Sequence, residues 1–257
     1  MAGLVLMIEM LKINPKLEKD FRQFHKTFVK FEKSLLNVSY SPEFDINGVT
    51  DPFLQARLIE VMKYTAKGSK EYTEELADLF VTVQSLTEAG KQTGYAIQYE
   101  IVKDINALEA NKGMKALSSN ILGKFLSGKD LNLKYIALNT LKDVIRYDLK
   151  AVQKHKDLIL SFLNESDISL QKRALDLIYL IINPNNLKQI TRECLKFLPN
   201  ADNELKLEVT SKLTDCIDQY ANNFKWEIDT LIKMIVLSSN HVYEDTLSKI
   251  INIIIII

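Results

Sequence analysis

Apolar residues recur at steps of three and four along nearly the whole chain, which is the period of an amphipathic α-helix. The spacing predicts helices over 16–36, 71–86, 92–108, 114–125, 131–145, 158–163, 170–181, 187–197, 205–217 and 226–235. The start of the chain, MAGLVLMIEMLKI, lacks a basic n-region, and Glu9 interrupts its apolar run. We expect a buried helix there rather than a targeting segment. The pattern therefore predicts an all-α fold.

Three of these helices begin with the same pattern of residues. The segments are GKDLNLKYIALNTL, ESDISLQKRALDLI and NADNELKLEVTSKL. In each, an Asp is followed by a Leu and then by a small or β-branched residue: Asp130, Leu133, Ala137; Asp167, Leu170, Ala174; Asp202, Leu205, Val209. The copies recur after about 35 to 40 residues, the period of HEAT and armadillo helix pairs. We expect the Asp to cap the helix, the Leu to fill the seam between repeats, and the small residue to allow close helix approach.

An earlier copy is present in GVTDPFLQARLIEVM. Asp51 is the expected cap, Pro52 is placed at the first helical position, and Leu54 and Leu58 are expected at the seam. The stretch 37–49 is the longest irregular one and is interpreted as a loop between repeats. About six helix pairs fit, so we expect one α-α superhelix over residues 1–257, of the armadillo/HEAT-like solenoid type. Glycines are expected at helix ends: Gly68, Gly90, Gly113 and Gly128.

Composition narrows the classes of function. Lys+Arg and Asp+Glu are both 33, so the zero net charge provides no global attraction to nucleic acid or to an anionic membrane. The two cysteines, Cys194 and Cys216, are interpreted as buried thiols of a reducing compartment, not as a disulfide or a metal site. No stretch reaches the ~20 apolar residues that a membrane span needs. The five isoleucines at the C-terminus would be prone to β-aggregation if exposed, so we expect further chain to cover them or a cut end.

The residue types that catalysis and cofactor binding require do not converge in the sequence. The histidines His25, His155 and His241 are far apart and have no metal ligands at the usual spacing. No glycine-rich phosphate loop is present. Trp226, the single tryptophan, is expected in the core, because the repeated Trp–Asn ladder of nuclear-import receptors is missing. We therefore predict no enzyme activity, no cofactor, no metal and no nucleic-acid partner.

One local excess of positive charge follows the helix that begins at Leu131. We call it the basic run, and it consists of Lys142, Arg146, Lys150, Lys154, His155 and Lys156. One interpretation is a site for an acidic partner, either a phosphoinositide headgroup or an acidic subunit surface. The other is a solvated helix end whose cations lie near the negative end of the helix dipole. Both interpretations remain open at this point.

The order of these segments resembles the trunk of the large adaptin subunits. The similarity is carried by GVTDPFLQARLIEVM, AIQYEIVKDI, SSNILGKFLSGKDLNLKYIAL, VQKHKDLILSFLNESDISLQKRALDLIYLIIN and FKWEIDTLIKMI. It is strongest to the gamma-adaptins and extends nearly from end to end. The resemblance implies the middle part of a trunk, with the N-terminal trunk repeats, hinge and ear domain absent.

The resemblance also implies a role and partners. A gamma-adaptin is a non-catalytic scaffold subunit of a clathrin adaptor complex that transports proteins between the trans-Golgi network and endosomes. Its partners are sigma-type small, mu-type medium and beta-type large subunits. An Arf-type GTPase, cargo tails and clathrin bind through parts outside this segment, and the complex is cytoplasmic and peripheral on membranes. Alternatives are another adaptin or coat subunit, a phosphatase scaffold, a transport receptor, or an accessory helical domain of an enzyme such as a lipid kinase.

Overall fold

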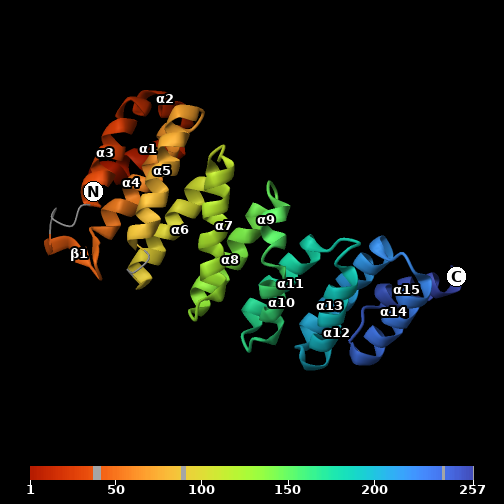
Figure 1. Ribbon diagram of the computed structural model, residues 1–257. Coiled ribbons are helices and arrows are strands. Elements are labelled where there is room, and N and C mark those ends of the chain that lie inside the picture. Colours follow the sequence, from red (N-terminus) through yellow and green to blue (C-terminus); the bar gives the residue numbers. More distant parts are fainter. Residues whose placement is uncertain (37–41, 88–90, 239–240, 257) are drawn as a thin grey trace. The chain divides into compact units, whose positions relative to one another are not determined.

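The computed structural model describes residues 1–36, 42–87, 91–238 and 241–256, and nearly all of them are helical (Figure 1). The predicted all-α fold is thus confirmed. The helices form two compact units, Met1–Leu122 and Gly123–Ile257. The single solenoid expected over 1–257 stays a prediction.

The first unit is built around its fourth helix. The helices are α1 (Ala2–Ile13), α2 (Glu18–Phe21), α3 (His25–Leu35), α4 (Pro52–Ala66), α5 (Lys70–Thr87), α6 (Lys91–Ala107) and the first part of α7 (Lys112–Ser127). Helix α4 packs against α1, α3 and α6, and α5 packs against α6. Burial of Leu58, Ile59 and Met62 on α4 explains its central place, because apolar area removed from water drives the packing. Asp51 accepts a hydrogen bond from the N–H of Leu54 at 3.1 Å, and Pro52 opens the helix, as predicted.

The prediction of one continuous helix over 16–36 is wrong. The 3-10 turns η1 (Pro15–Leu17) and η2 (Arg22–Phe24) interrupt it. At the second turn the Arg22 guanidinium donates to the carbonyl oxygen of Lys67 at 2.5 Å. This tertiary hydrogen bond fixes the local backbone, and periodicity contains no information about it.

Helix α1 exists as predicted, but the expectation that it is buried is wrong. Only Ile8 and Leu11 are buried, while Leu6 and Ile13 are exposed. The reason is that α1 packs against α4 along one face. The other side of this apolar helix therefore faces solvent within the unit.

The predicted loop over 37–49 includes a small hairpin. Residues 37–41 lie outside the described residues; the rest contains η3 (Pro42–Phe44) and strands β1 (Asp45–Ile46) and β2 (Val49–Thr50), paired antiparallel. Asn47 and Gly48 have φ of 55° and 81°. Two left-handed residues between paired strands are the geometry that an Asn-Gly turn favours. This dipeptide was the signal that could have predicted the hairpin.

The second unit consists of two layers of helices. Its elements after α7 are α8 (Leu131–Val144), α9 (Leu149–Gln153), α10 (Lys156–Ser161), η4 (Phe162–Asn164), α11 (Ile168–Ile181), α12 (Leu187–Phe197), η5 (Leu198–Asn200), α13 (Asn203–Tyr220), α14 (Phe224–Ser238) and α15 (Glu244–Ile256). In the first layer, α8, α11, α13 and α15 contact one another in that order. The second layer holds α10, α12 and α14, which pack against the first. The short helix α9 was not predicted.

The repeated motif is confirmed as a set of helix caps. Asp130, Asp167 and Asp202 accept from N–H groups of the first turns of α8, α11 and α13 at 2.8 to 2.9 Å. The small positions Ala137, Ala174 and Val209 are fully buried, as are Leu170 and Leu205, while Leu133 is half-buried.

The predicted glycines lie at helix ends wherever the structure describes them. Gly68 and Gly128 follow α4 and α7, and Gly113 lies in the first turn of α7. Gly90 lies outside the described residues.

Replacing Asp167 by alanine is expected to lower the free energy of unfolding by about 1 kcal/mol. The N–H groups of Ser169 and Leu170 would lose their common acceptor. Thermal unfolding should show a lower midpoint for Asp167→Ala than for Asp167→Ser, which keeps a capping oxygen. Asp229→Ala, in an exposed position of α14, is the control and should leave the midpoint unchanged. Equal midpoints for Asp167→Ala and the control would contradict the role of the cap.

Candidate functional site

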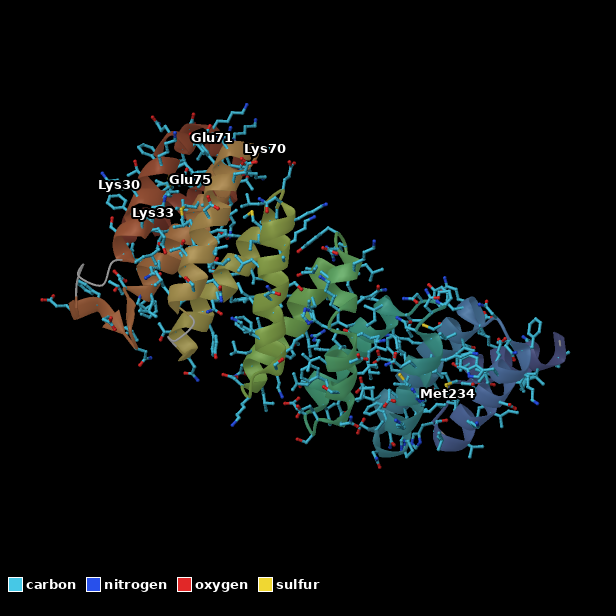
Figure 2. All side chains as sticks on the ribbon, viewed as in Figure 1. Lys30, Lys33, Lys70, Glu71, Glu75 and Met234 are labelled. Carbon is cyan, nitrogen blue, oxygen red and sulfur yellow. The ribbon has the colours of Figure 1, made fainter. Side chains whose placement is uncertain are left out.

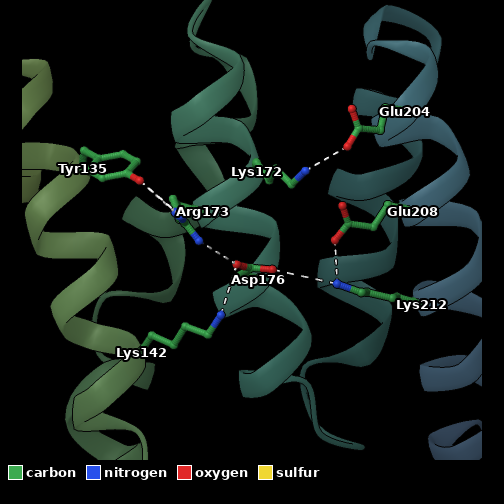
Figure 3. A network of polar contacts seen from close by, with 8 residues as sticks. All are labelled: Tyr135, Lys142, Lys172, Arg173, Asp176, Glu204, Glu208 and Lys212. Carbon is green, nitrogen blue, oxygen red and sulfur yellow. Dashed lines mark hydrogen bonds and ion pairs between the residues drawn. The ribbon is translucent and has the colours of Figure 1, made fainter.

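A network of charged side chains covers the first layer of the second unit (Figure 3). Its centre is the carboxylate of Asp176 on α11. Lys142 of α8 lies 3.2 Å from this carboxylate, Arg173 of α11 lies 3.4 Å from it, and Lys212 of α13 lies 3.8 Å from it. One acidic group therefore links three successive helices of the layer.

The network extends to either side of Asp176. Lys172 of α11 contacts Glu204 of α13 at 2.9 Å, and Lys212 also contacts Glu208 at 2.5 Å. The guanidinium of Arg173 donates to the Tyr135 hydroxyl at 3.1 Å, and this hydrogen bond lowers the pKa of Tyr135. The alternating signs present a surface of mixed charge, suited to a polar protein partner more than to a polyanion. Each exposed pair contributes ~1 kcal/mol at most, so the network sets register more than stability.

The structure separates the members of the basic run. Lys142 is paired with Asp176, and Lys156 donates to Gln189 at 2.6 Å. The ring of His155 lies against the α7 backbone, because a Cβ added at Gly123 would come within 2.8 Å of its Cε1 atom.

The other three members, Arg146, Lys150 and Lys154, are exposed and have no ion-pair partner among the described residues. These three remain available to an external ligand.

The first unit holds ionisable groups that the sequence analysis missed. Asp104 of α6 is fully buried, and its carboxylate lies 3.2 Å from Lys63 of α4. Burial raises the pKa of Asp104 well above its usual range, in spite of the lysine. Asp104 follows Ile97 and Ile101 on the apolar side of its helix, and that spacing was the available signal.

Helix α3 contributes two more buried groups. Glu32 is fully buried, no described group hydrogen-bonds its carboxyl oxygens, and burial raises its pKa to about 8. His25 contacts Thr65 Oγ1 at 2.7 Å and stacks on Tyr72, and burial lowers its pKa to about 4. His25 is therefore neutral at pH 7 and joins α3 to α4 and α5 as a packing group.

Among the described residues, no group of three or more His, Cys, Asp or Glu is placed to hold a metal ion. Both cysteines are free; Cys194 is buried, which raises the pKa of its thiol to about 12, and Cys216 is half-buried. Trp226 is half-buried, with Lys188 5.8 Å from the centre of its ring. None of the described helices combines the length and apolar composition needed to cross a membrane.

Helix pairs that repeat along the chain, joined by ion pairs between successive helices of the first layer, define the class of α-helical repeat scaffolds. Residues 2–256 match the family described as Adaptin N terminal region, and the chain belongs to that family. The predicted resemblance to gamma-adaptin is confirmed.

Three relatives are all named as AP-1 complex gamma subunits. The AP-1 complex subunit gamma of Dictyostelium discoideum is 36% identical over 254 residues, which are 99% of this chain and 28% of the relative. The gamma-1 subunit of Mycosarcoma maydis is 39% identical over 254 residues, 99% of this chain and 29% of the relative. The gamma-2 subunit of Arabidopsis thaliana is 37% identical over 245 residues, which are 95% of this chain and 28% of the relative. The chain thus spans less than a third of the length of these relatives, whose names describe subunits of a complex.

Proposed function

We propose that the chain is a non-catalytic scaffold subunit of a clathrin-associated adaptor complex of the AP-1 type. The observation that supports this proposal most strongly is the family match over residues 2–256, at 36 to 39% identity to gamma subunits of three organisms. The mechanism is geometric. Each helix pair adds a strip of surface, and side chains between the pairs select the partner.

The partners in this proposal are a beta-type large, a mu-type medium and a sigma-type small subunit. The first-layer network supports the choice of protein partners, because its alternating charges offer both donors and acceptors. Cargo tails, clathrin and an Arf-type GTPase are assigned to parts of the complex outside this chain. The complex acts on trans-Golgi and endosomal membranes, where it associates peripherally.

Co-expression with the beta, mu and sigma subunits of one organism tests the proposal. The tagged chain is expected to capture at least one of them in stoichiometric amount. The catalytic subunit of a phosphatase, which is the partner of a different HEAT scaffold, is co-expressed as the negative control and should not be captured. A folded, helical chain that captures the phosphatase subunit, or none of the three adaptor subunits, would refute the proposal.

A further inference from the structure

The turns of the second unit bring cations and exposed apolar side chains to one edge. The connections from α8, α11 and α13 to the second-layer helices α10, α12 and α14 lie at the same edge of the unit, and the first of these connections contains α9 (Figure 1). Side-chain contacts join the starts of the second-layer helices. Gln189 of α12 contacts both Lys156 and Asp157 of α10 at 2.6 and 3.0 Å, and Lys188 of α12 lies over Trp226 of α14. We call this surface the turn edge.

Positive charge at the turn edge is not neutralised within the protein. Five cations lie there: Arg146, Lys150, Lys154, Lys188 and Lys225, all exposed. None of the five forms an ion pair with a described residue. Five acidic residues lie at the same turns, and two of them are paired with other lysines: Asp157 with Lys156 at 3.8 Å and Asp218 with Lys249 at 3.6 Å. The remaining acids are Asp143, Asp148, which caps α9, and the buried Glu227, so the five unpaired cations outnumber them and the edge has a net positive charge.

Large apolar side chains protrude at the same turns. Tyr147 and Leu149 flank the α8–α9 turn, Leu180 lies at the end of α11, and Phe224 begins α14 with 65% of its surface exposed. Each of the three turns thus has both an exposed apolar side chain and at least one of the five exposed cations. A partner that binds the turn edge only through charge would leave these apolar side chains exposed to water. A bilayer with anionic headgroups satisfies both, since the cations contact the headgroups and the apolar groups enter the interface.

We propose that the turn edge of the second unit binds anionic lipid bilayers directly. The chain contacts the membrane through Arg146, Lys150 and Lys154 at one turn and through Lys188, Phe224 and Lys225 at the next ones. This inference does not depend on assembly with partner subunits.

Vesicle sedimentation with the chain alone tests the proposal. We expect binding to vesicles of phosphatidylcholine and phosphatidylserine at a ratio of about 7:3, and little binding to pure phosphatidylcholine. Each lysine near an anionic surface contributes ~1 kcal/mol, so the double change Lys150→Glu with Lys154→Glu should weaken binding by at least ~30-fold. Phe224→Ser should weaken the binding that persists at high salt.

The first unit offers matched controls. Lys30→Glu with Lys33→Glu makes the same change in net charge at two exposed lysines of α3 (Figure 2). Phe53→Ser removes a ring that is as exposed as that of Phe224, since the exposed fractions of the two residues are 68% and 65%. Both control proteins should bind as the unmodified chain does, and far-UV circular dichroism should show that all variants are folded.

Three outcomes would overturn the proposal. These are no binding to the anionic vesicles, equal losses in edge and control variants, and edge variants that bind vesicles normally. If the last were accompanied by weaker capture of an adaptor subunit, the turn edge would be a protein interface.

Discussion

Replacing Gly94 by alanine is expected to lower the free energy of unfolding by about 3 kcal/mol. Gly94 lies in the first turns of α6, where a Cβ atom would overlap the carbonyl oxygen of Thr87 at the end of α5. The obstacle is backbone and not the tip of a flexible side chain, so the two helices must move apart. Overpacking of this kind costs ~1–3 kcal/mol and occasionally more. Chemical denaturation monitored by circular dichroism would measure the change.

The same substitution elsewhere in the chain provides the control. Gly3 lies in α1, and nothing is within 4 Å of a Cβ added there. Gly3→Ala should therefore leave stability unchanged or raise it by ~0.5 kcal/mol, because alanine restricts the unfolded chain. If Gly94→Ala proved as stable as Gly3→Ala, the close approach of α5 and α6 would be disproved.

Replacing Glu32 by glutamine is expected to stabilise the protein at pH 7 by about 3 kcal/mol. Burial raises the pKa of Glu32 from 4.5 to about 8, so the folded protein keeps this carboxyl protonated at pH 7 while the unfolded chain ionises it. Folding must then take up a proton. The stability that this group provides is full below pH 4.5 and is lost as the pH rises to 8. Glutamine is neutral at every pH and avoids this loss.

The pH dependence distinguishes this effect from a general gain in packing. The difference between Glu32→Gln and the unmodified chain should be near zero at pH 4.5 and grow by ~1.4 kcal/mol for each pH unit up to pH 8. Urea unfolding at several pH values measures it. Glu43→Gln, at an exposed position, is the control and should show no such slope. A difference that does not vary with pH would mean that Glu32 is ionised in the folded protein.

The parts of the fold that the sequence predicted are those determined by neighbouring residues. The caps Asp130, Asp167 and Asp202 act on N–H groups two or three residues away, so the motif and its structure share one short segment. The same applies to most helix limits, because the apolar period is local. The interruption of the 16–36 helix depends on Lys67, far along the chain, and could not be predicted from that segment.

The charged groups show the same division. Glu32 follows Phe28 and Val29 at helical spacing, so its burial could have been predicted from the apolar pattern. Asp176, by contrast, draws two of its cations, Lys142 and Lys212, from helices more than thirty residues away. A basic run along the chain does not show which lysines such distant carboxylates will neutralise. The family resemblance was detectable because it depends on the order of many short segments.

The ion pairs that join neighbouring repeats of the second unit have a consequence for how such a chain can change in length. Lys134–Glu165, Lys142–Asp176, Lys172–Glu204 and Lys249–Asp215 join residues separated by 31, 34, 32 and 34 positions. If one complete helix pair is duplicated or lost, each lysine still lies next to a carboxylate at the equivalent position of the neighbouring repeat. An insertion of a few residues within a first-layer helix instead rotates every later side chain around its axis and breaks the series. Evolution of this chain by whole repeats is therefore tolerated, whereas small insertions are confined to the turns.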